Sequence, residues 1–228
     1  ASEDTGPKPG ATLFSPGFRG LPNQPRLISM GDGATPPRRL VGVLPRTQPK
    51  TPPSHRGRVV RLNDDGTTPA DNPFTGDAAA DPAVWSLGHR NIQGMVYDPI
   101  HRRVWASEHG SRGGDELNWI QPGANHGWPV ASFSAEYSSG RPVAPRTTAP
   151  GMVDPRRVWM ATIAPSGLAV VTADRFPQWR GNLLAGGLVD RGLRRLQLND
   201  KGEVIAESLI PIGARVRDVR QGPDGYLY

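Results

Sequence analysis

The sequence predicts an all-β protein built from short strands. No helical period is sustained over ten residues, whereas short alternating segments separated by glycine and aspartate turns recur along the chain. One pattern, L-Q-L-N-D-K-G at residues 196–202, echoes V-R-L-N-D-D-G at residues 60–66, about 136 residues earlier. That offset is near three periods of about 45 residues, the length of a four-stranded β-propeller blade. We therefore expect a repeated four-stranded antiparallel unit.

The N-terminal quarter of the chain gives few structural signals. Residues 1–53 are rich in proline and glycine, and the only clear strand signal is L-I-S-M at residues 27–30, before a turn at 31–33. Residues 34–54 have the composition of a loop. We expect residues 1–53 to form an irregular segment with one possible strand, and residues 54–228 to form the body of the protein.

The pattern sharpens at residue 58. The segment R-V-V-R-L at residues 58–62 predicts a strand, and N-D-D-G at residues 63–66 predicts a tight hairpin turn. Residues 67–83 then form a polar excursion that contains prolines.

Three polar clusters lie in the centre of the chain. They are H-R-N at residues 89–91, E-H-G-S-R-G-G-D-E at residues 108–116 and N-H-G-W-P at residues 125–129. Two alternating segments, at residues 95–97 and 104–106, predict strands joined by a turn at Asp98 and Pro99. The clusters are therefore expected in loops at strand ends, where a rigid sheet presents side chains to a ligand. The alternative is that they are solvated turns.

The C-terminal third predicts more strands. Strand signals occur near residues 163–168, 184–188 and 193–198, and the turn at residues 199–202 leads into Val204. The alternation of R-V-R-D-V-R at residues 215–220 places Arg215 and Arg217 on one face of a strand. The chain stops at Tyr228 within another strand signal, so we interpret it as a partial chain.

Composition limits the possible classes of protein. A chain of 228 residues can form one β domain or two small ones, and the absence of cysteine excludes disulfides and thiolate metal sites. No run of 18 apolar residues is present, which excludes a predicted membrane-spanning helix. The N-terminus lacks the apolar region of a signal peptide, so an exported form would already have lost its signal.

The net charge of +6 comes almost entirely from arginine, since lysine occurs only at Lys8, Lys50 and Lys201. Basic residues are scattered in isolated pairs and are not interleaved with aromatic residues, so nucleic-acid binding is the weakest interpretation. The planar guanidinium group is suited to binding carboxylates.

The central clusters resemble the glucose/sorbosone dehydrogenase family of soluble quinoprotein aldose dehydrogenases. The similar segments are G-H-R-N-I-Q-G at residues 88–94, E-H-G-S-R-G-G-D-E-L-N at residues 108–118, and N-H-G-W-P. Ile92 and Ser111 replace prolines of the family pattern, and His126 replaces a tyrosine. The resemblance extends over about residues 54–228 and implies a six-bladed β-propeller. At about 40–50 residues per blade, the chain would supply about four to five blades.

The resemblance also implies a site for pyrroloquinoline quinone (PQQ). Arg90 and Asn91 match family positions that contact the quinone, and Arg215 and Arg217 match paired arginines that hold its carboxylates. Forked guanidinium donors are suited to such an anion. The alternative for each arginine is an ordinary surface charge.

Two calcium sites are implied in the same way. Main-chain carbonyls of Gly110 and Ser111 match the cofactor calcium site, and Glu116 with the carbonyl of His126 matches a second site in bacterial members. A zinc site formed by His89, His109 and His126 is not supported, because their spacings fit no zinc-ligand motif.

Two features depart from the family pattern. A lysine near the quinone corresponds here to Val189, and no histidine precedes His55, where the family has its general base. The catalytic base is therefore unknown, and we expect this chain alone to be a poor or inactive enzyme.

The resulting hypothesis is PQQ- and Ca²⁺-dependent oxidation of the C1 hydroxyl of an aldose sugar to a lactone, with hydride passing to the quinone. It implies a small-molecule sugar, an external electron acceptor, a periplasmic or secreted location, and a monomer or homodimer. The alternative is a non-catalytic β-propeller that binds a glycan or a protein partner.

Overall fold

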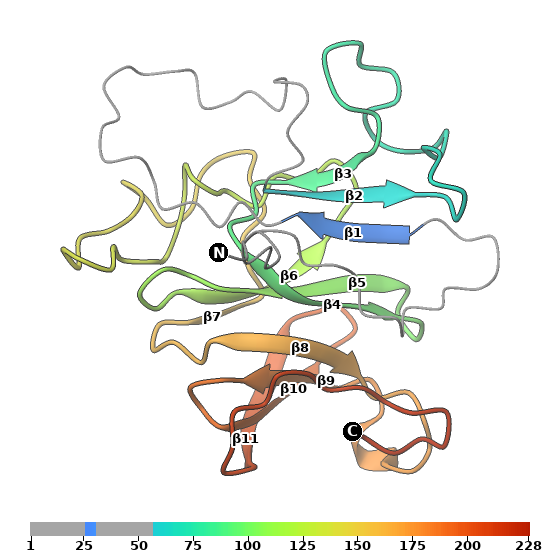
Figure 1. Cartoon of the computed structure of the whole chain (residues 1–228), viewed down its shortest axis with the longest axis vertical. Coiled ribbons are helices and arrows are strands. Elements are labelled where there is room, and N and C mark those ends of the chain that lie inside the picture. Colours follow the sequence, from blue (N-terminus) through green and yellow to red (C-terminus); the bar gives the residue numbers. More distant parts are fainter. Residues whose placement is uncertain (1–25, 31–56) are drawn as a thin grey trace, which may run out of the picture.

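The structure, a computed structural model, describes residues 26–30 and 57–228. These residues form three antiparallel sheets that lie one above another in Figure 1. The first sheet contains β1 (Arg26–Met30), β2 (Arg58–Leu62) and β3 (Val84–Leu87). The second contains β4 (Ile92–Asp98), β5 (Arg103–Glu108), β6 (Asp115–Ile120) and β7 (Arg157–Trp159). The third contains β8 (Pro165–Val170), β9 (Leu183–Gly187), β10 (Gly192–Leu198) and β11 (Val204–Pro211), with a short 3-10 helix at Pro177–Trp179.

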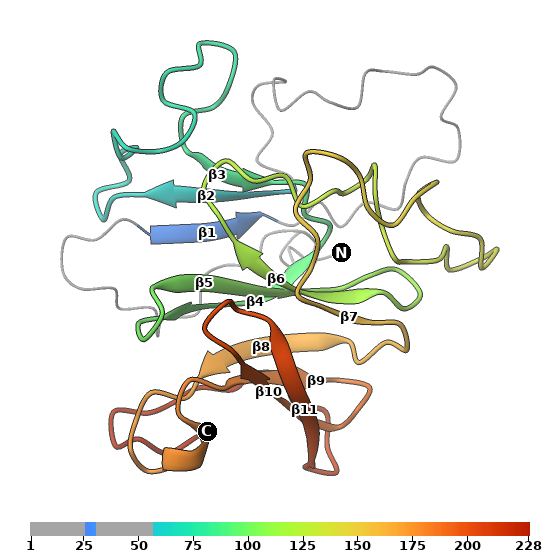
Figure 2. The ribbon, with the colours of Figure 1, turned by 180° about the vertical axis from the view of Figure 1, so that it is seen from behind.

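Strands β4 and β8 begin their sheets and pack against each other, as Figure 2 shows from behind. Their backbones approach closely at Gly94, where an added Cβ atom would lie 2.4 Å from the carbonyl oxygen of Ser166. Glycine therefore allows the contact that brings the second and third sheets together.

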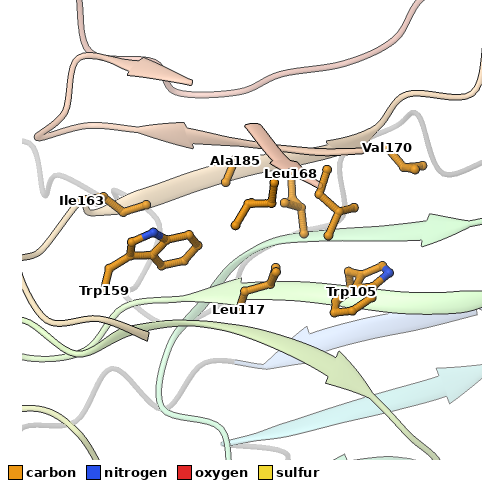
Figure 3. Close-up of a cluster of buried hydrophobic side chains, with 9 residues drawn as sticks. Trp105, Leu117, Trp159, Ile163, Leu168, Val170 and Ala185 are labelled. Atoms are coloured by element: carbon orange, nitrogen blue, oxygen red, sulfur yellow. The ribbon is translucent and has the colours of Figure 1, made fainter. Parts of the chain in front are cut away.

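Two apolar clusters fill the spaces between neighbouring sheets. The larger cluster lies between the second and third sheets and includes Trp105, Leu117 and Leu168 (Figure 3). A smaller cluster between the first and second sheets includes Val59 and Ala106. Trp105 and Ala106 are consecutive in β5, and consecutive strand residues point to opposite faces of a sheet. The second sheet is therefore apolar on both faces, as expected for a blade with a neighbour on each side.

Most expected strands are confirmed. The N-terminal signal at residues 27–30 corresponds to β1, which pairs with β2 along its whole length. The turns at residues 98–102 and 199–202 join β4 to β5 and β10 to β11. The expected turn at residues 31–33, the loop at 34–54 and His55 lie outside the described residues.

The described residues form three sheets of an incomplete propeller, with long connections at residues 67–83 and 121–156 within the first and second sheets. The echo of residues 60–66 at 196–202 relates β2 and β10, which lie two sheets apart, each beside the last strand of its sheet. Two other expectations need correction. Asp115 and Glu116 lie in β6 and not in a loop, and residues 215–220 are not assigned to a strand.

No helix in the parts of the chain that the structure describes is long and apolar enough to cross a membrane. The architecture is an incomplete, all-β propeller.

Candidate functional site

The polar clusters of the sequence meet where β4 and β8 begin and β5 ends. His109, which follows β5, shares a 2.7 Å hydrogen bond between its Nε2 atom and the carbonyl oxygen of Pro165 in β8. The hydroxyl of Ser166 donates to the carbonyl oxygen of Val216 at 2.6 Å. The amide of Gly167 donates to the carbonyl oxygen of Arg217 at 3.3 Å. A chain of direct contacts therefore connects the second cluster to the segment that carries Arg215 and Arg217.

Arg90 connects the first cluster to the second. Its side chain is largely buried, and Nη1 donates to the carbonyl oxygens of His109 at 2.9 Å and Gly110 at 2.8 Å. The guanidinium carbon lies 5.5 Å from the ring centroid of Trp128, within cation–π range. The Nε atom of Arg90 is buried and has no hydrogen-bond partner within residues 26–30 and 57–228. One donor of this guanidinium therefore remains unused beside the converging loops.

Glu108, the last residue of β5, holds the loop that contains Arg90. Its Oε2 atom accepts from the backbone amides of Arg90 at 2.7 Å and Asn91 at 3.2 Å. Its Oε1 atom accepts from the side-chain amide of Asn118 at 2.7 Å and lies 3.3 Å from Nδ1 of His89. Burial alone would raise the pKa of Glu108, but the hydrogen bond and charge of His89, with the two backbone amides, hold it below its ordinary value.

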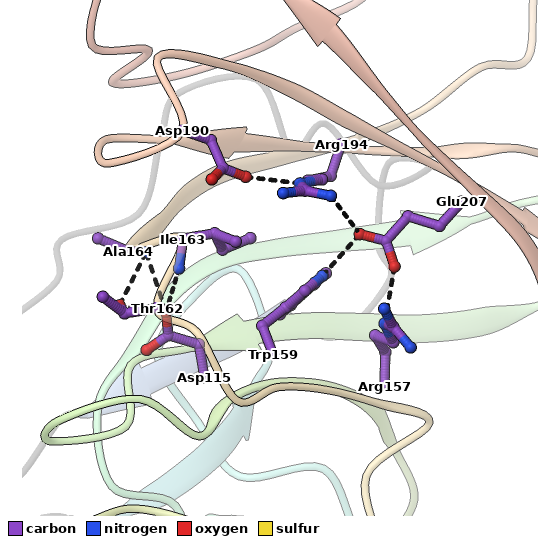
Figure 4. Close-up of polar contacts among 9 residues, drawn as sticks. All are labelled: Asp115, Arg157, Trp159, Thr162, Ile163, Ala164, Asp190, Arg194 and Glu207. Carbon is purple, nitrogen blue, oxygen red and sulfur yellow. Dashed lines mark hydrogen bonds and ion pairs between the residues drawn. The ribbon is translucent and has the colours of Figure 1, made fainter.

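Asp115, the first residue of β6, fixes the second cluster in the same manner. Oδ1 accepts from the backbone amide of Gly110 at 2.9 Å. Oδ2 accepts from the hydroxyl of Thr162 and from the amides of Ile163 and Ala164 at 2.7–2.9 Å (Figure 4). The loop after β5 is therefore tied to the β7–β8 connection, and through it to the third sheet.

A small pocket opens between these loops. Its volume of about 10 Å³ has room for a single water molecule or ion. Four of the expected site residues, or their backbones, line it: Arg90, Gly110, Glu116 and His126. Its other lining residues are Gly88, Glu108, His109, Gly114, Trp128, Ala131, Ser132 and Ser134.

Glu116 and Glu108 lie directly opposite each other in the β5–β6 pairing. Two like charges in such a pair repel each other. Burial, together with the charges of Glu108, Asp115 and Asp154, raises the pKa of Glu116 to about 8. Glu116 therefore holds a proton at neutral pH unless a cation neutralises the pair.

His126 forms the opposite wall of the pocket. Its ring is buried, stacks on His89 with centroids 4.6 Å apart, and neither ring nitrogen has a hydrogen-bond partner in the described part of the chain. Burial and the charge of His89 lower the pKa of His126 well below its ordinary value. The imidazole is consequently neutral and adds no positive charge to the pocket.

The remaining expected residues do not line the pocket. The side-chain oxygen of Asn91 accepts from Gln93 Nε2 at 2.8 Å, so the amide nitrogen of Asn91 is the donor of this side chain. Ser111 follows Gly110 but does not line the pocket. Arg215 and Arg217 are exposed and flank the less exposed Val216. Both side chains are therefore open to solvent, in a segment that is not part of a sheet.

The three histidines of the zinc alternative do not form one cluster. His89 and His126 stack on each other, whereas His109 contacts Pro165 in the third sheet. The described residues also contain no group of three or more histidine and acidic side chains placed to hold a metal ion. A metal here would need main-chain carbonyl ligands.

Sequence patterns did not predict the buried residues that support the site, Glu108, Asp115 and Asn118 among them. The first two lay within a recognised polar cluster but were interpreted as loop residues. Their partners are distant in sequence, as for Asp115 and Ala164, so local pattern could not reveal them.

Comparison with known proteins identifies the family to which this site belongs. The Glucose / Sorbosone dehydrogenase family model matches residues 22–228. The chain belongs to this family. It is 57% identical over 221 residues to an uncharacterised protein of Synechocystis, covering 97% of this chain and 54% of that protein. It is 43% identical over 175 residues to the aldose sugar dehydrogenase YliI of Escherichia coli, covering 76% of this chain and 47% of that protein.

Solved structures of family members show the same fold. The apo-form of the soluble aldose sugar dehydrogenase from Escherichia coli aligns with a TM-score of 0.76 at 36% identity, over 90% of this chain and 56% of that one. The PQQ-bound aldose sugar dehydrogenase from Streptomyces coelicolor aligns with a TM-score of 0.60 at 29% identity, over 85% and 48%. The chain spans about half the length of the curated relatives it matches.

Proposed function

We propose that this chain supplies part of the site of a PQQ- and Ca²⁺-dependent aldose sugar dehydrogenase, which oxidises the C1 hydroxyl of a sugar to a lactone. The observation that carries the proposal is Arg90, a largely buried arginine held at the convergence of three family motifs with one donor unused. A buried guanidinium group needs an anionic or carbonyl partner for each donor. The polycarboxylate PQQ is such a partner, and PQQ is bound in the solved relative from Streptomyces coelicolor.

The donor set fits PQQ, although the pocket itself is too small for it. A volume of about 10 Å³ admits one water molecule or ion and not a cofactor. Arg90, Arg215 and Arg217 would bind the carboxylates of PQQ, and the side-chain amide of Asn91 would donate to it. When bound, PQQ supplies the acceptor for the hydride from the sugar.

The two proposed calcium sites differ in how well they fit. The carbonyl of Gly110 already accepts from the guanidinium of Arg90, so a cation at Gly110 and Ser111 would compete with a positive charge. Glu116, with the carbonyl of His126, fits better. It faces the pocket with a raised pKa, and a hard divalent cation would neutralise its repulsion with Glu108.

The catalytic base is not assigned to any histidine at residues 57–228. His89 is bonded to Ser86 and Glu108, His101 to Asp98, and His109 to the carbonyl of Pro165. His126 is buried. In the proposed reaction the described residues bind and orient the cofactor. The proposal also includes a small-molecule sugar as substrate and an external electron acceptor. It further includes a periplasmic or secreted location and a monomeric or homodimeric state.

Titration of the purified chain with PQQ, with and without Ca²⁺, tests the cofactor site. We expect Ca²⁺-dependent absorbance of bound PQQ, and at least tenfold weaker binding for Arg90→Met, because one desolvated guanidinium contact contributes about 1.5–3 kcal/mol. Arg180→Gln is the matched control, since Arg180 is half-exposed and pairs with Asp174 on the β8–β9 connection. Equal binding by both variants would contradict the assignment of Arg90.

Activity is a separate test. We expect little oxidation of glucose by the PQQ-loaded chain with an artificial dye acceptor, because no base is positioned by its described residues. Turnover comparable to that of a complete relative would show that the base lies in this chain. No PQQ-induced absorbance would favour the alternative, a non-catalytic propeller that binds a glycan or protein partner.

A further inference from the structure

We propose that Glu108 is the positioning residue of the cofactor loop: its buried carboxylate fixes the ring of His89 and the backbone amides of Arg90 and Asn91, and thereby places the guanidinium of Arg90. This inference rests on the proposed function for its consequence, since Arg90 is the proposed PQQ ligand. The positioning itself concerns only residues of this chain.

The contacts of Glu108 cover the whole loop. Its carboxylate accepts from the amides of Arg90 and Asn91, from Asn118, and bonds with the ring of His89. Nε2 of that ring in turn lies 2.8 Å from the hydroxyl of Ser86 in β3. Three consecutive residues of the loop are therefore held by one side chain, and the loop is anchored to both the first and the second sheet.

A carboxylate is required for this role because the surrounding groups are mainly donors. Ionised glutamate offers acceptor sites on both oxygens, whereas glutamine offers one oxygen and would turn an NH₂ group toward another donor. Glu108 is almost completely buried, so an unpaired amide there cannot turn to water. Replacement by glutamine should therefore displace the loop, although the two side chains have nearly the same shape.

Asp115 provides a matched comparison within the same sheet. It is equally buried and also accepts from backbone amides, but it holds Gly110 and the β7–β8 connection and not the loop of Arg90. Asp115→Asn should therefore weaken the protein while leaving the backbone amides of Arg90 and Asn91 bonded to Glu108.

The first test needs no cofactor. Amide hydrogen exchange of the folded chain should show at least tenfold faster exchange at Arg90 and Asn91 in Glu108→Gln, with little change at Ala106 in the middle of β5. Asp115→Asn should leave the Arg90 and Asn91 amides protected. Unchanged protection of these two amides in Glu108→Gln, or an equal loss across β5, would overturn the proposal.

The second test asks whether Glu108 acts through Arg90. We expect Glu108→Gln to raise the Kd for PQQ at least tenfold in the wild-type chain. In the Arg90→Met variant the same substitution should raise the Kd less than about twofold further, because the effects of interacting residues are non-additive. The Glu108→Asp variant should recover part of the affinity. Additive losses in the double variant would overturn the proposal. If the wild-type chain does not bind PQQ, the proposed function fails, whereas the exchange experiment still decides the role of Glu108.

Discussion

Two polar networks join the second and third sheets, or the loops between them, and they are built from different partners. At the inner end, Asp115 accepts mainly from backbone amides of the loops that surround the site. At the outer edge, Glu207 of β11 accepts hydrogen bonds from Arg194 and the indole of Trp159, and it forms an ion pair with Arg157 (Figure 4). Asp115 is almost completely buried, whereas the side chain of Arg157 is 45% exposed.

This difference shows what each network can do. A backbone amide in a closed loop cannot turn to solvent, so the carboxylate that it meets determines the loop's position. An exposed arginine side chain can leave its partner and be hydrated, so the outer network joins the sheets without fixing an exact geometry. The inner network is therefore suited to a binding site, and the outer one to general stabilisation.

The largest effect is expected from Asp115→Ala. It leaves the buried amides of Gly110 and Ile163 without their acceptor and removes a second acceptor from Ala164. We expect the free energy of unfolding to fall by about 3 kcal/mol, measured by urea denaturation, because two buried donors become unpaired. The effect should be insensitive to salt, as the interaction is buried. A loss below about 1 kcal/mol would show that the loops rearrange and that the inner network does not fix them.

The second prediction concerns the pH dependence caused by Glu116. Its folded-state pKa is about 8, above its ordinary value of 4.5, so the folded protein holds a proton that the unfolded chain releases. The resulting stabilisation is complete below about pH 4.5 and is lost as the pH rises toward about 8, at up to about 1.4 kcal/mol per pH unit. Glu116→Gln should remove this slope in urea denaturation measured between pH 5 and 8.

Calcium binding provides a second test of Glu116. If Glu116 is a calcium ligand, millimolar Ca²⁺ should stabilise the wild-type protein most at high pH, because the cation replaces the proton and binds only the folded state. Glu116→Gln should lose this response. An equal response in the variant would place calcium elsewhere.

The third prediction concerns His126, whose pKa is lowered where that of Glu116 is raised. In the unfolded chain this histidine binds a proton as the pH falls below about 6.5, whereas in the folded state it does not. The free energy of unfolding that is present above pH 6.5 is therefore lost as the pH falls. The loss should be about 1 kcal/mol at pH 5.5. His126→Tyr, which restores the residue of the family motif, should abolish it, whereas a persistent slope in the variant would assign the effect to another group.

The sequence predicted the strands well but not the supports of the site. Strands such as β2 and β10 carry an alternating pattern that is set by neighbouring residues, and so it is visible locally. Strand β6 was missed because Asp115, Glu116 and Asn118 give it the composition of a loop. Those polar residues are accommodated by partners from other loops, which no local pattern records.

Arg90 and Glu108 illustrate the same limit at the site itself. The family motif indicated that Arg90 is functional, but a charged residue such as Glu108 is ordinarily expected at the surface. Its burial is possible only because three backbone or side-chain donors and a histidine meet it.

The smallest effect is expected from Glu207→Gln at the outer edge. Glutamine can keep the hydrogen bond from the indole of Trp159, while it loses its charge attraction to Arg157 and Arg194. Because both arginines reach solvent, we expect a loss of no more than about 1 kcal/mol at low salt, falling toward zero in 1 M NaCl. Urea denaturation at two salt concentrations measures this, with Asp115→Ala as the salt-insensitive reference. A Glu207→Gln loss that is as large as that of Asp115→Ala and independent of salt would remove the distinction between the two networks. It would mean that the outer ion pairs also determine the geometry of the sheets, although their arginines are accessible to water.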